Sequence, residues 1–196
     1  MIIWLNGAFG AGKTTSAFEL HRRLPHSFVY DPENIGFFIR KNTPITTHKP
    51  DFQDYEQWRL FNYEMLKMIA SEYDGTIIVP MTIVNRQYYD EIIQRLKDEG
   101  ILVKHFILYA NKETILKRLN KRLARGETWA KAQVDRCIHA FDHEITEEKI
   151  ITDDKSIDEV VEEIAQRSEV SILPDHRNAW RKMLDRGITL IKHIRT

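Results

Sequence analysis

The sequence has few of the features that mark secreted, membrane-spanning or nucleic-acid-binding proteins. It contains one cysteine, Cys137, which cannot form an internal disulfide and suits a reducing compartment. Its 29 basic and 29 acidic residues leave no net charge that would draw the chain to nucleic acid. No apolar run approaches the roughly 20 residues of a membrane-spanning helix, and no secretory signal is visible. We therefore expect a cytoplasmic protein that binds small molecules rather than nucleic acid.

One glycine-rich stretch carries the most specific signal in the chain. Residues 7–14 read Gly-Ala-Phe-Gly-Ala-Gly-Lys-Thr, which fits the phosphate-binding loop G-x-x-x-x-G-K-[ST] between a predicted strand and a predicted helix. In such a loop, backbone amides and the helix N-terminus surround the phosphates, Lys13 neutralises their charge and Thr14 offers its hydroxyl to Mg²⁺. We therefore expect a nucleoside triphosphate with Mg²⁺. The predicted cofactor-binding residues here are Gly7, Ala8, Phe9, Gly10, Ala11, Gly12, Lys13, Thr14 and Thr15.

Predicted strands and helices alternate along the chain. Strand patterns occupy 1–5, 27–30, 76–79, 102–109 and 149–151, and helical spacing occupies 15–24, 52–73, 86–99, 112–123, 130–141 and 157–167. This order is typical of a three-layer P-loop α/β fold, in which helices cover both faces of a mainly parallel five-stranded sheet. The length of 196 residues fits one domain, which we place at 1–170, followed by a C-terminal segment at 171–196.

Several polar residues follow the predicted strands. Because ligands of such folds bind at the carboxyl ends of the strands, we expect Asp31 and Met81 to face an acceptor, and Thr152 and Asp153 to face the nucleotide. Asp31 is the candidate to take the proton of an acceptor hydroxyl or to hold Mg²⁺ through water. The alternative is an aspartate that only caps the turn before Pro32.

Three arginines indicate which kind of phosphate-binding protein this is. Arg118 and Arg122 lie four residues apart on one predicted helix, and Arg136 lies on the next. The pattern resembles the lid, here at about 118–140, of nucleoside monophosphate kinases and related small-molecule kinases. That resemblance implies catalytic arginines that cover the adenine ring and clamp the migrating phosphoryl group. The alternative for each of them is a solvent-exposed, salt-bridged helix face.

An aromatic-rich segment, 34–73, lies where kinases of this kind bind their acceptor. Phe38 and Trp58 are candidates to contact a base or an acyl chain, and Arg59 is a candidate to hold a phosphate or sugar hydroxyls. Helical spacing from Trp58 onward is also typical of a core face, and a surface salt bridge is the alternative for Arg59. Both interpretations stay open at this point.

Two motifs of other P-loop proteins are incomplete. The third predicted strand ends at Pro80 without the aspartate that binds Mg²⁺ in ATPases and GTPases. Residues 111–114 start like the guanine-binding motif of GTPases, but Thr114 lacks the carboxylate that accepts hydrogen bonds from guanine. Both observations argue against a motor protein or a GTPase and favour ATP.

Beyond these motifs, the sequence resembles the bacterial tunicamycin-resistance proteins of bacilli from end to end. The shared stretches are GAFGxGKT at 7–14, AFELHRRL at 17–24, VYDPE at 29–33, WR at 58–59, IVPMTIV at 78–84, KET at 112–114, DRC at 135–137 and HIR at 193–195. The resemblance implies an ATP-binding protein that protects the cell from tunicamycin, a uridine-containing nucleoside antibiotic with sugars and a fatty acyl chain. Three mechanisms stay open: phosphorylation of the drug, ATP-dependent binding of the drug without chemistry, and phosphorylation of another nucleoside or sugar.

The end of the chain has a different pattern. Trp180, Met183, Leu184 and Ile191 lie at helical spacing, and arginines and lysines outnumber acids on the other face. This predicts a basic amphipathic helix within 171–196 that contacts an anionic membrane surface as a peripheral element. The alternative is a last helix that packs back on the domain with its basic face outward.

Overall fold

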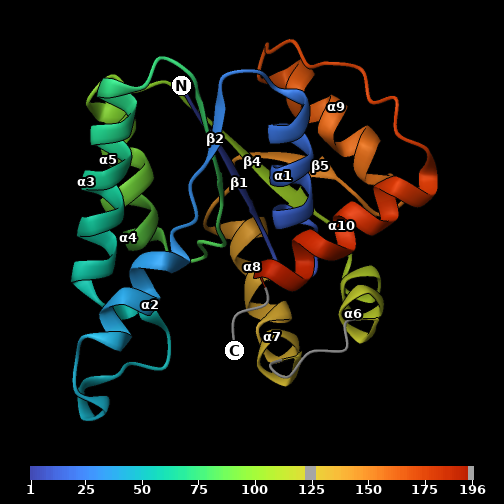
Figure 1. The fold of residues 1–196 in the computed structure, drawn as a ribbon. Helices are drawn as coiled ribbons and strands as arrows, with labels where there is room; N and C mark the ends of the chain where they lie inside the picture. Colours follow the sequence, from blue (N-terminus) through green and yellow to red (C-terminus); the bar gives the residue numbers. More distant parts are fainter. Residues whose placement is uncertain (122–126, 194–196) are drawn as a thin grey trace.

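In the computed structural model, which describes residues 1–121 and 127–193, five strands form one parallel sheet. Neighbouring strands all run parallel, so helices must connect them. Across the sheet the order is β2 (Ser27–Val29), β3 (Thr76–Pro80), β1 (Ile2–Gly7), β4 (Val103–Tyr109) and β5 (Glu148–Ile151). The predicted three-layer P-loop α/β fold is confirmed (Figure 1).

Helices cover both faces of the sheet, as Figure 1 shows. Because β1 is buried on both sides, its side chains alternate between two cores, with Ile3 and Leu5 facing one and Ile2 and Trp4 facing the other. The first core is closed by α1 (Lys13–Arg23) and α9 (Ile157–Arg167). The second is closed by α3 (Glu56–Glu72), α4 (Arg86–Tyr89), α5 (Arg95–Asp98) and α8 (Val134–His143).

Some helical segments differ from the predicted ranges. The helical spacing of the sequence did not predict α2 (Glu33–Lys41), a short helix that starts directly after Pro32. The helix predicted at 52–73 begins with a 3₁₀ turn, η2 (Phe52–Asp54), because Tyr55 is extended and separates that turn from α3. The remaining segments are η1 (Ile45–Thr47), a π-helical turn at Asp90–Gln94 between α4 and α5, α6 (Lys112–Asn120) and α7 (Glu127–Ala132).

The C-terminal helix α10 (Ala179–His193) packs on the domain with charged side chains facing inward. Arg186 pairs with Asp158 at the start of α9, with 2.7 Å between Nη2 and Oδ1. On the opposite side of the helix, Trp180 and Met183 are 67% and 66% exposed. The helix therefore packs back on the domain, but it presents its apolar side rather than its basic side to solvent. Within the described residues, no helix combines the length and the apolar character that crossing a bilayer requires.

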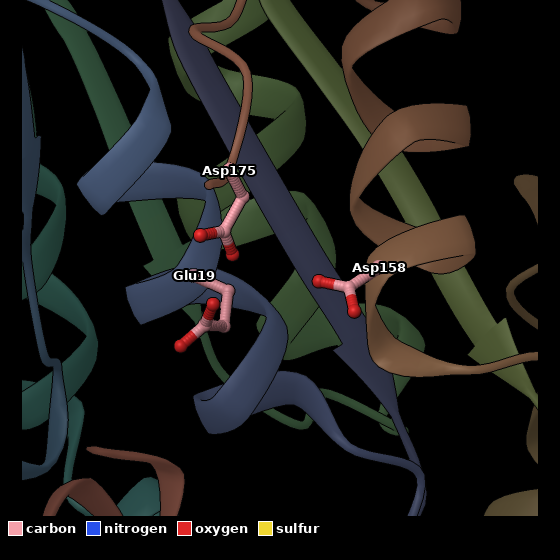
Figure 2. Close-up of side chains that lie close together, drawn as sticks. All are labelled: Glu19, Asp158 and Asp175. Carbon is pink, nitrogen blue, oxygen red and sulfur yellow. The ribbon is translucent and has the colours of Figure 1, made fainter. Parts of the chain in front are cut away.

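Figure 2 shows that the side chains of Glu19 of α1, Asp158 of α9 and Asp175 lie close together, and Lys182 and Arg186 of α10 pair with this group. Their carboxylate oxygens lie within 4.8 Å of one another, as ligands of a metal ion would. However, Arg177 pairs with Glu19 and with Asp175, and Lys182 pairs with Asp158 and Asp175 at 3.3 Å each. These cations hold the pKa of Asp175 well below its usual value, with the hydrogen bond from Arg177 as the largest cause. The cluster is therefore an ion-pair network that fastens the chain end to the domain.

Candidate functional site

The phosphate-binding loop lies between β1 and α1, as predicted. Gly12 is the N-cap of α1 and adopts the left-handed conformation, with φ 99°, which a glycine adopts without strain. Gly7 packs so tightly that a Cβ atom there would lie 2.5 Å from the carbonyl oxygen of Leu108 in β4. Buried Asn6 fixes the start of the loop, because its Oδ1 accepts from the amides of Gly7 and Ile83 at 2.8 and 2.9 Å. The glycines thus serve close packing and a tight turn.

Lys13 directs its ammonium group back over the loop. Its Nζ donates to the carbonyl oxygens of Gly7 at 2.9 Å and Ala8 at 3.1 Å, and it lies 5.4 Å from the centre of the Phe9 ring. A positive charge held there faces the space that the loop amides surround, where phosphate oxygens bind in proteins of this kind. The predicted role of Lys13 as a phosphate ligand fits this position.

The loop opens into a cavity of about 440 Å³ at the carboxyl edge of the sheet. Segments far apart in the sequence line it. They are Phe9, Gly10, Gly12, Lys13, Thr14 and Phe18 from the loop and α1, Asp31, Glu33, Phe37 and Arg40 after β2, Pro50, Asp51, Phe52 and Gln53 around η2, Pro80, Met81 and Thr82 at the end of β3, and Trp129 of α7. The predicted loop residues Gly7, Ala8, Ala11 and Thr15 are buried behind this surface.

Asp31 caps a turn and also lines the cavity, so both of the roles predicted from its position in the sequence are compatible with its place. Its Oδ1 accepts a hydrogen bond from the amide of Glu33 at 3.0 Å and so caps the turn before α2. The same residue lines the cavity that Lys13 and Thr14 also line. The Thr14 hydroxyl and the Asp31 carboxylate are oxygen donors of the kind that Mg²⁺ prefers. The residues present therefore fit a magnesium-bound nucleotide.

The other predicted acceptor residues divide into two groups. Met81 lines the cavity, as expected from its place after β3. Phe38 does not line it and is 57% exposed, because its neighbour Phe37 occupies the inward position on α2. Trp58 is fully buried, and its Nε1 donates to the carbonyl oxygen of Pro32 at 3.0 Å. Trp58 is therefore part of the core behind the cavity wall.

Arg59 is also placed behind the cavity wall rather than on it. Its Nε forms a salt bridge with Glu91, and its Nη1 donates to the carbonyl oxygen of Gln53 at 2.7 Å. The guanidinium group lies 4.3 Å from the centre of the Tyr88 ring. Arg59 thus fixes η2, which carries cavity residues, and both its charge and its donors are used in that role.

Several cavity residues were missed by sequence reasoning, notably Arg40, Asp51 and Trp129. Burial raises the pKa of the Asp51 carboxyl, and the nearby Arg136 and Arg40 act in the opposite direction. Trp129 stacks edge to face on Phe9 of the phosphate loop, with 5.0 Å between ring centres. None of these residues belongs to a recognisable motif. The signals that could have found them are the Pro50-Asp51 turn and an exposed tryptophan in the lid.

The residues predicted to face the nucleotide at β5 lie together, beside the cavity. Arg118 of α6 donates to the Thr152 hydroxyl at 3.0 Å and to the Thr152 carbonyl oxygen, and Asp153 accepts from the amide of Asn111 at 3.1 Å. Burial lowers the pKa of Arg118, whereas the charge of Asp153 raises it. The strand-end rule placed Thr152 and Asp153 after β5, but it also predicted that they share one crevice with the phosphate loop, and neither they nor Arg118 line the cavity.

The two other arginines predicted in the lid are Arg122 and Arg136, and the structure describes only Arg136. Arg122 lies outside the described residues. Arg136 of α8 is exposed and donates to the Gln133 side chain at 3.3 Å. Burial raises the pKa values of Asp51 and Cys137, and the charge of Arg136 opposes both shifts, so Arg136 acts on groups at the cavity and behind the phosphate loop.

A phosphate-binding loop at the carboxyl edge of a 2-3-1-4-5 parallel sheet, with an acid in the same cavity, defines a kinase-like P-loop NTPase. Residues 2–144 match the family model described as "AAA domain". The structure of the Deinococcus radiodurans tunicamycin resistance protein is 33% identical, with a TM-score of 0.74, over 89% of this chain and 98% of that protein. This chain therefore belongs to the AAA-domain family of P-loop proteins and is a relative of that tunicamycin resistance protein.

More distant structures share the fold. A sugar kinase from Janibacter is 18% identical, with a TM-score of 0.62, over 87% of this chain and 95% of that protein. Shikimate kinase from Bacteroides thetaiotaomicron is also 18% identical, with a TM-score of 0.60, over 87% of this chain and 99% of that protein. A comparison with curated protein sequences gave no match. The distant similarities establish the small-molecule-kinase architecture and leave the acceptor to be argued from the cavity.

Proposed function

We propose that this protein is an ATP-dependent phosphotransferase that moves the γ-phosphoryl group of ATP to a hydroxyl of a tunicamycin-like nucleoside antibiotic. The observation that carries the proposal is one cavity that joins Lys13 and Thr14 of the phosphate loop to Asp31 after β2. Phosphoryl transfer requires mainly that donor and acceptor be held together while charge is neutralised. A cavity with a phosphate loop at one end and an acid at the other meets both requirements.

In the proposed reaction, the acceptor oxygen forms a bond to the γ-phosphorus as the bond from that phosphorus to the bridging oxygen breaks. ADP is the leaving group, and the proton of the acceptor hydroxyl passes to Asp31. Lys13 stabilises the charge on the transferred group and on the leaving oxygen. Thr14 would hold Mg²⁺ through its hydroxyl, and the ion would neutralise further phosphate charge; holding that ion through water is the alternative role of Asp31.

The lid supplies the other proposed catalytic groups. Arg118 and Arg136 stabilise the moving phosphoryl group, together with Arg122, and Arg118 with Thr152 and Asp153 binds the nucleotide. Two contacts support this proposal: Arg118 donates a hydrogen bond to the Thr152 hydroxyl, and the Trp129 ring of the lid packs on Phe9 of the phosphate loop. Closure of such a lid excludes the water that would otherwise hydrolyse ATP.

We choose a tunicamycin-like antibiotic as the acceptor because the chain is 33% identical to the Deinococcus radiodurans tunicamycin resistance protein over 89% of its length. A uracil ring or an acyl chain suits the aromatic side chains of the cavity, of which Phe37 and Phe52 are examples. Mass spectrometry of tunicamycin after incubation with the protein and Mg·ATP tests the proposal. We expect a phosphate adduct, and none with Lys13→Ala. Tightly bound, unmodified drug would support sequestration instead, and an adduct only on another nucleoside or sugar would change the substrate.

We also propose that the protein works in the cytoplasm and contacts the membrane peripherally through α10. The apolar side chains Trp180, Met183 and Leu184 are exposed, whereas Lys182 and Arg186 are paired with the domain, so the apolar side would enter the lipid. Co-sedimentation with anionic vesicles should fall for Trp180→Ser/Leu184→Ser and change little for Arg181→Gln. Equal sedimentation of the double variant and the unaltered protein would contradict this contact.

A further inference from the structure

The polar lining of the cavity is divided by charge. The phosphate loop contributes Lys13, whereas the segments after β2 and around η2, which we call the acceptor end, contribute the carboxylates of Asp31, Glu33 and Asp51. Among the described residues that line the cavity, Arg40 is the cation at that end. An acceptor in this space therefore meets more negative than positive charge.

Arg40 is held by the chain around it. Its Nη2 donates to the carbonyl oxygens of Lys49 and Pro50, at 3.0 Å each, directly before Asp51. Its guanidinium group also lies 5.7 Å from the centre of the Phe52 ring. These contacts position the segment that presents Asp51 and Phe52. They also point the donors of Nη2 at backbone rather than at the cavity.

Phe52 forms a fixed apolar surface beside these carboxylates. Its ring packs against Trp58, with 5.6 Å between ring centres, and against Gly36 of α2. A Cβ atom at Gly36 would lie 2.6 Å from Cγ of Phe52, so the glycine leaves the space that the ring needs. An aromatic face next to hydrogen-bond acceptors suits a ring that is apolar on one face and carries donors at its edge.

We propose that the acceptor end selects a hydroxyl-rich, uncharged or cationic ring and excludes anionic acceptors, with Asp51 and Glu33 as the specificity-determining residues. Ionised carboxylates only accept hydrogen bonds, so a bound group must donate through a hydroxyl, an amide or an ammonium group. A phosphate or carboxylate on the acceptor has no donor to offer and is repelled. This inference rests on the proposed function, because it concerns the acceptor of the same cavity. It separates this protein from kinases whose acceptors carry phosphate.

The test compares two nucleotides that differ by one anionic group at the acceptor end. Adenosine 5′-tetraphosphate extends ATP by a phosphate beyond the γ position, and equilibrium binding of both with saturating Mg²⁺ needs no transfer. For the unaltered protein we expect the tetraphosphate to bind roughly tenfold more weakly than ATP, since like charges brought together oppose binding. Asp51→Asn/Glu33→Gln should reduce this ratio severalfold. Asn keeps an oxygen that can accept from the Gln53 amide, as Asp51 does at 2.9 Å, so the η2 cap survives.

Glu56→Gln is the matched control. Glu56 is an exposed acid at the start of α3, near in sequence but outside the cavity lining, and its loss should leave the ratio unchanged. Tighter binding of the tetraphosphate than of ATP by the unaltered protein would overturn the inference, as would a ratio that the double variant leaves unchanged. Because binding is measured without an acceptor, these outcomes are independent of whether the drug is phosphorylated.

Discussion

The two ends of the cavity are built in different ways. At the phosphate end, β1, the loop and α1 are consecutive in the sequence, and backbone conformation at Gly7 and Gly12 shapes the site. At the acceptor end, side chains from separate segments meet, among them Asp31, Phe37 and Asp51. The first end thus depends on local backbone geometry, and the second depends on tertiary packing. Changes at the first should impair ATP use with any acceptor, whereas changes at the second should act on the acceptor alone.

The largest effect is expected for Asp31→Asn, which removes the proposed proton acceptor. Loss of a general base usually lowers the rate by roughly 10²- to 10⁴-fold. Asn can still accept from the Glu33 amide, so the turn before α2 should be retained and ATP binding should be unchanged. Transfer kinetics and ATP binding measured on the same preparation check this prediction. A folded Asp31→Asn protein with unchanged transfer would return Asp31 to a purely turn-capping role.

Lys13→Ala should impair the phosphate end whatever acceptor is offered. Loss of one preorganised charge partner typically costs on the order of 10²-fold or more in rate. Lys104→Ala is the matched control, because Lys104 lies near the amino end of β4 and pairs with Glu169. ATP binding and turnover are the measurements. If both are unaffected in Lys13→Ala, the loop does not serve as the phosphate site.

Gly36→Ala should affect the acceptor end without affecting ATP. The added Cβ would lie 2.6 Å from Phe52, and relieving such overpacking typically costs about 1–3 kcal/mol. We expect the KM for the drug to rise about tenfold as Phe52 shifts, while the KM for ATP stays constant. Gly187→Ala is the control, because a Cβ there meets nothing within 4 Å. An equal rise in both KM values would show that the two ends are not separable in this way.

The smallest expected effect is on stability, from Asp51→Asn. Burial raises the pKa of Asp51 in the folded state, so its ionised form opposes folding, and this cost appears as pH rises through the folded-state pKa. The variant should therefore melt slightly higher than the unaltered protein at pH 7. The difference should shrink as the pH falls through the unfolded-state pKa of about 3.9 and disappear about one unit below it, where the carboxyl is protonated in both states. A lower Tm for the variant at pH 7 would show that Asp51 stabilises the fold through its charge.

The difference between the two ends also explains what could be predicted from the sequence. The parallel five-stranded sheet, the phosphate loop and the place of Thr152 and Asp153 after the last strand follow from periodicity, from a motif and from the order of the elements. The roles of Trp58 and Arg59 could not be decided from the sequence, because helical spacing alone does not distinguish a core face from a binding face. Asp51 and Trp129 reach the cavity only through long-range packing, which no local pattern encodes.

The C-terminal helix shows the same limit. Its amphipathic pattern predicts a helix, but the pattern does not say which face turns toward the domain. The acids that form salt bridges with Arg177 and Arg186 lie on α1, on α9 and in the segment before α10, far apart in the sequence. Only the folded arrangement shows that the basic residues are paired with the domain.

The central claim, that both ends of one cavity act together in phosphoryl transfer, is tested most directly by stoichiometry. Purified protein is given Mg·ATP with limiting tunicamycin, and ADP formed and drug phosphorylated are quantified together. The account predicts one ADP for each phosphorylated drug molecule, with negligible ADP when the drug is omitted. ADP formation without modified drug, or bound drug with no ADP at all, would contradict it.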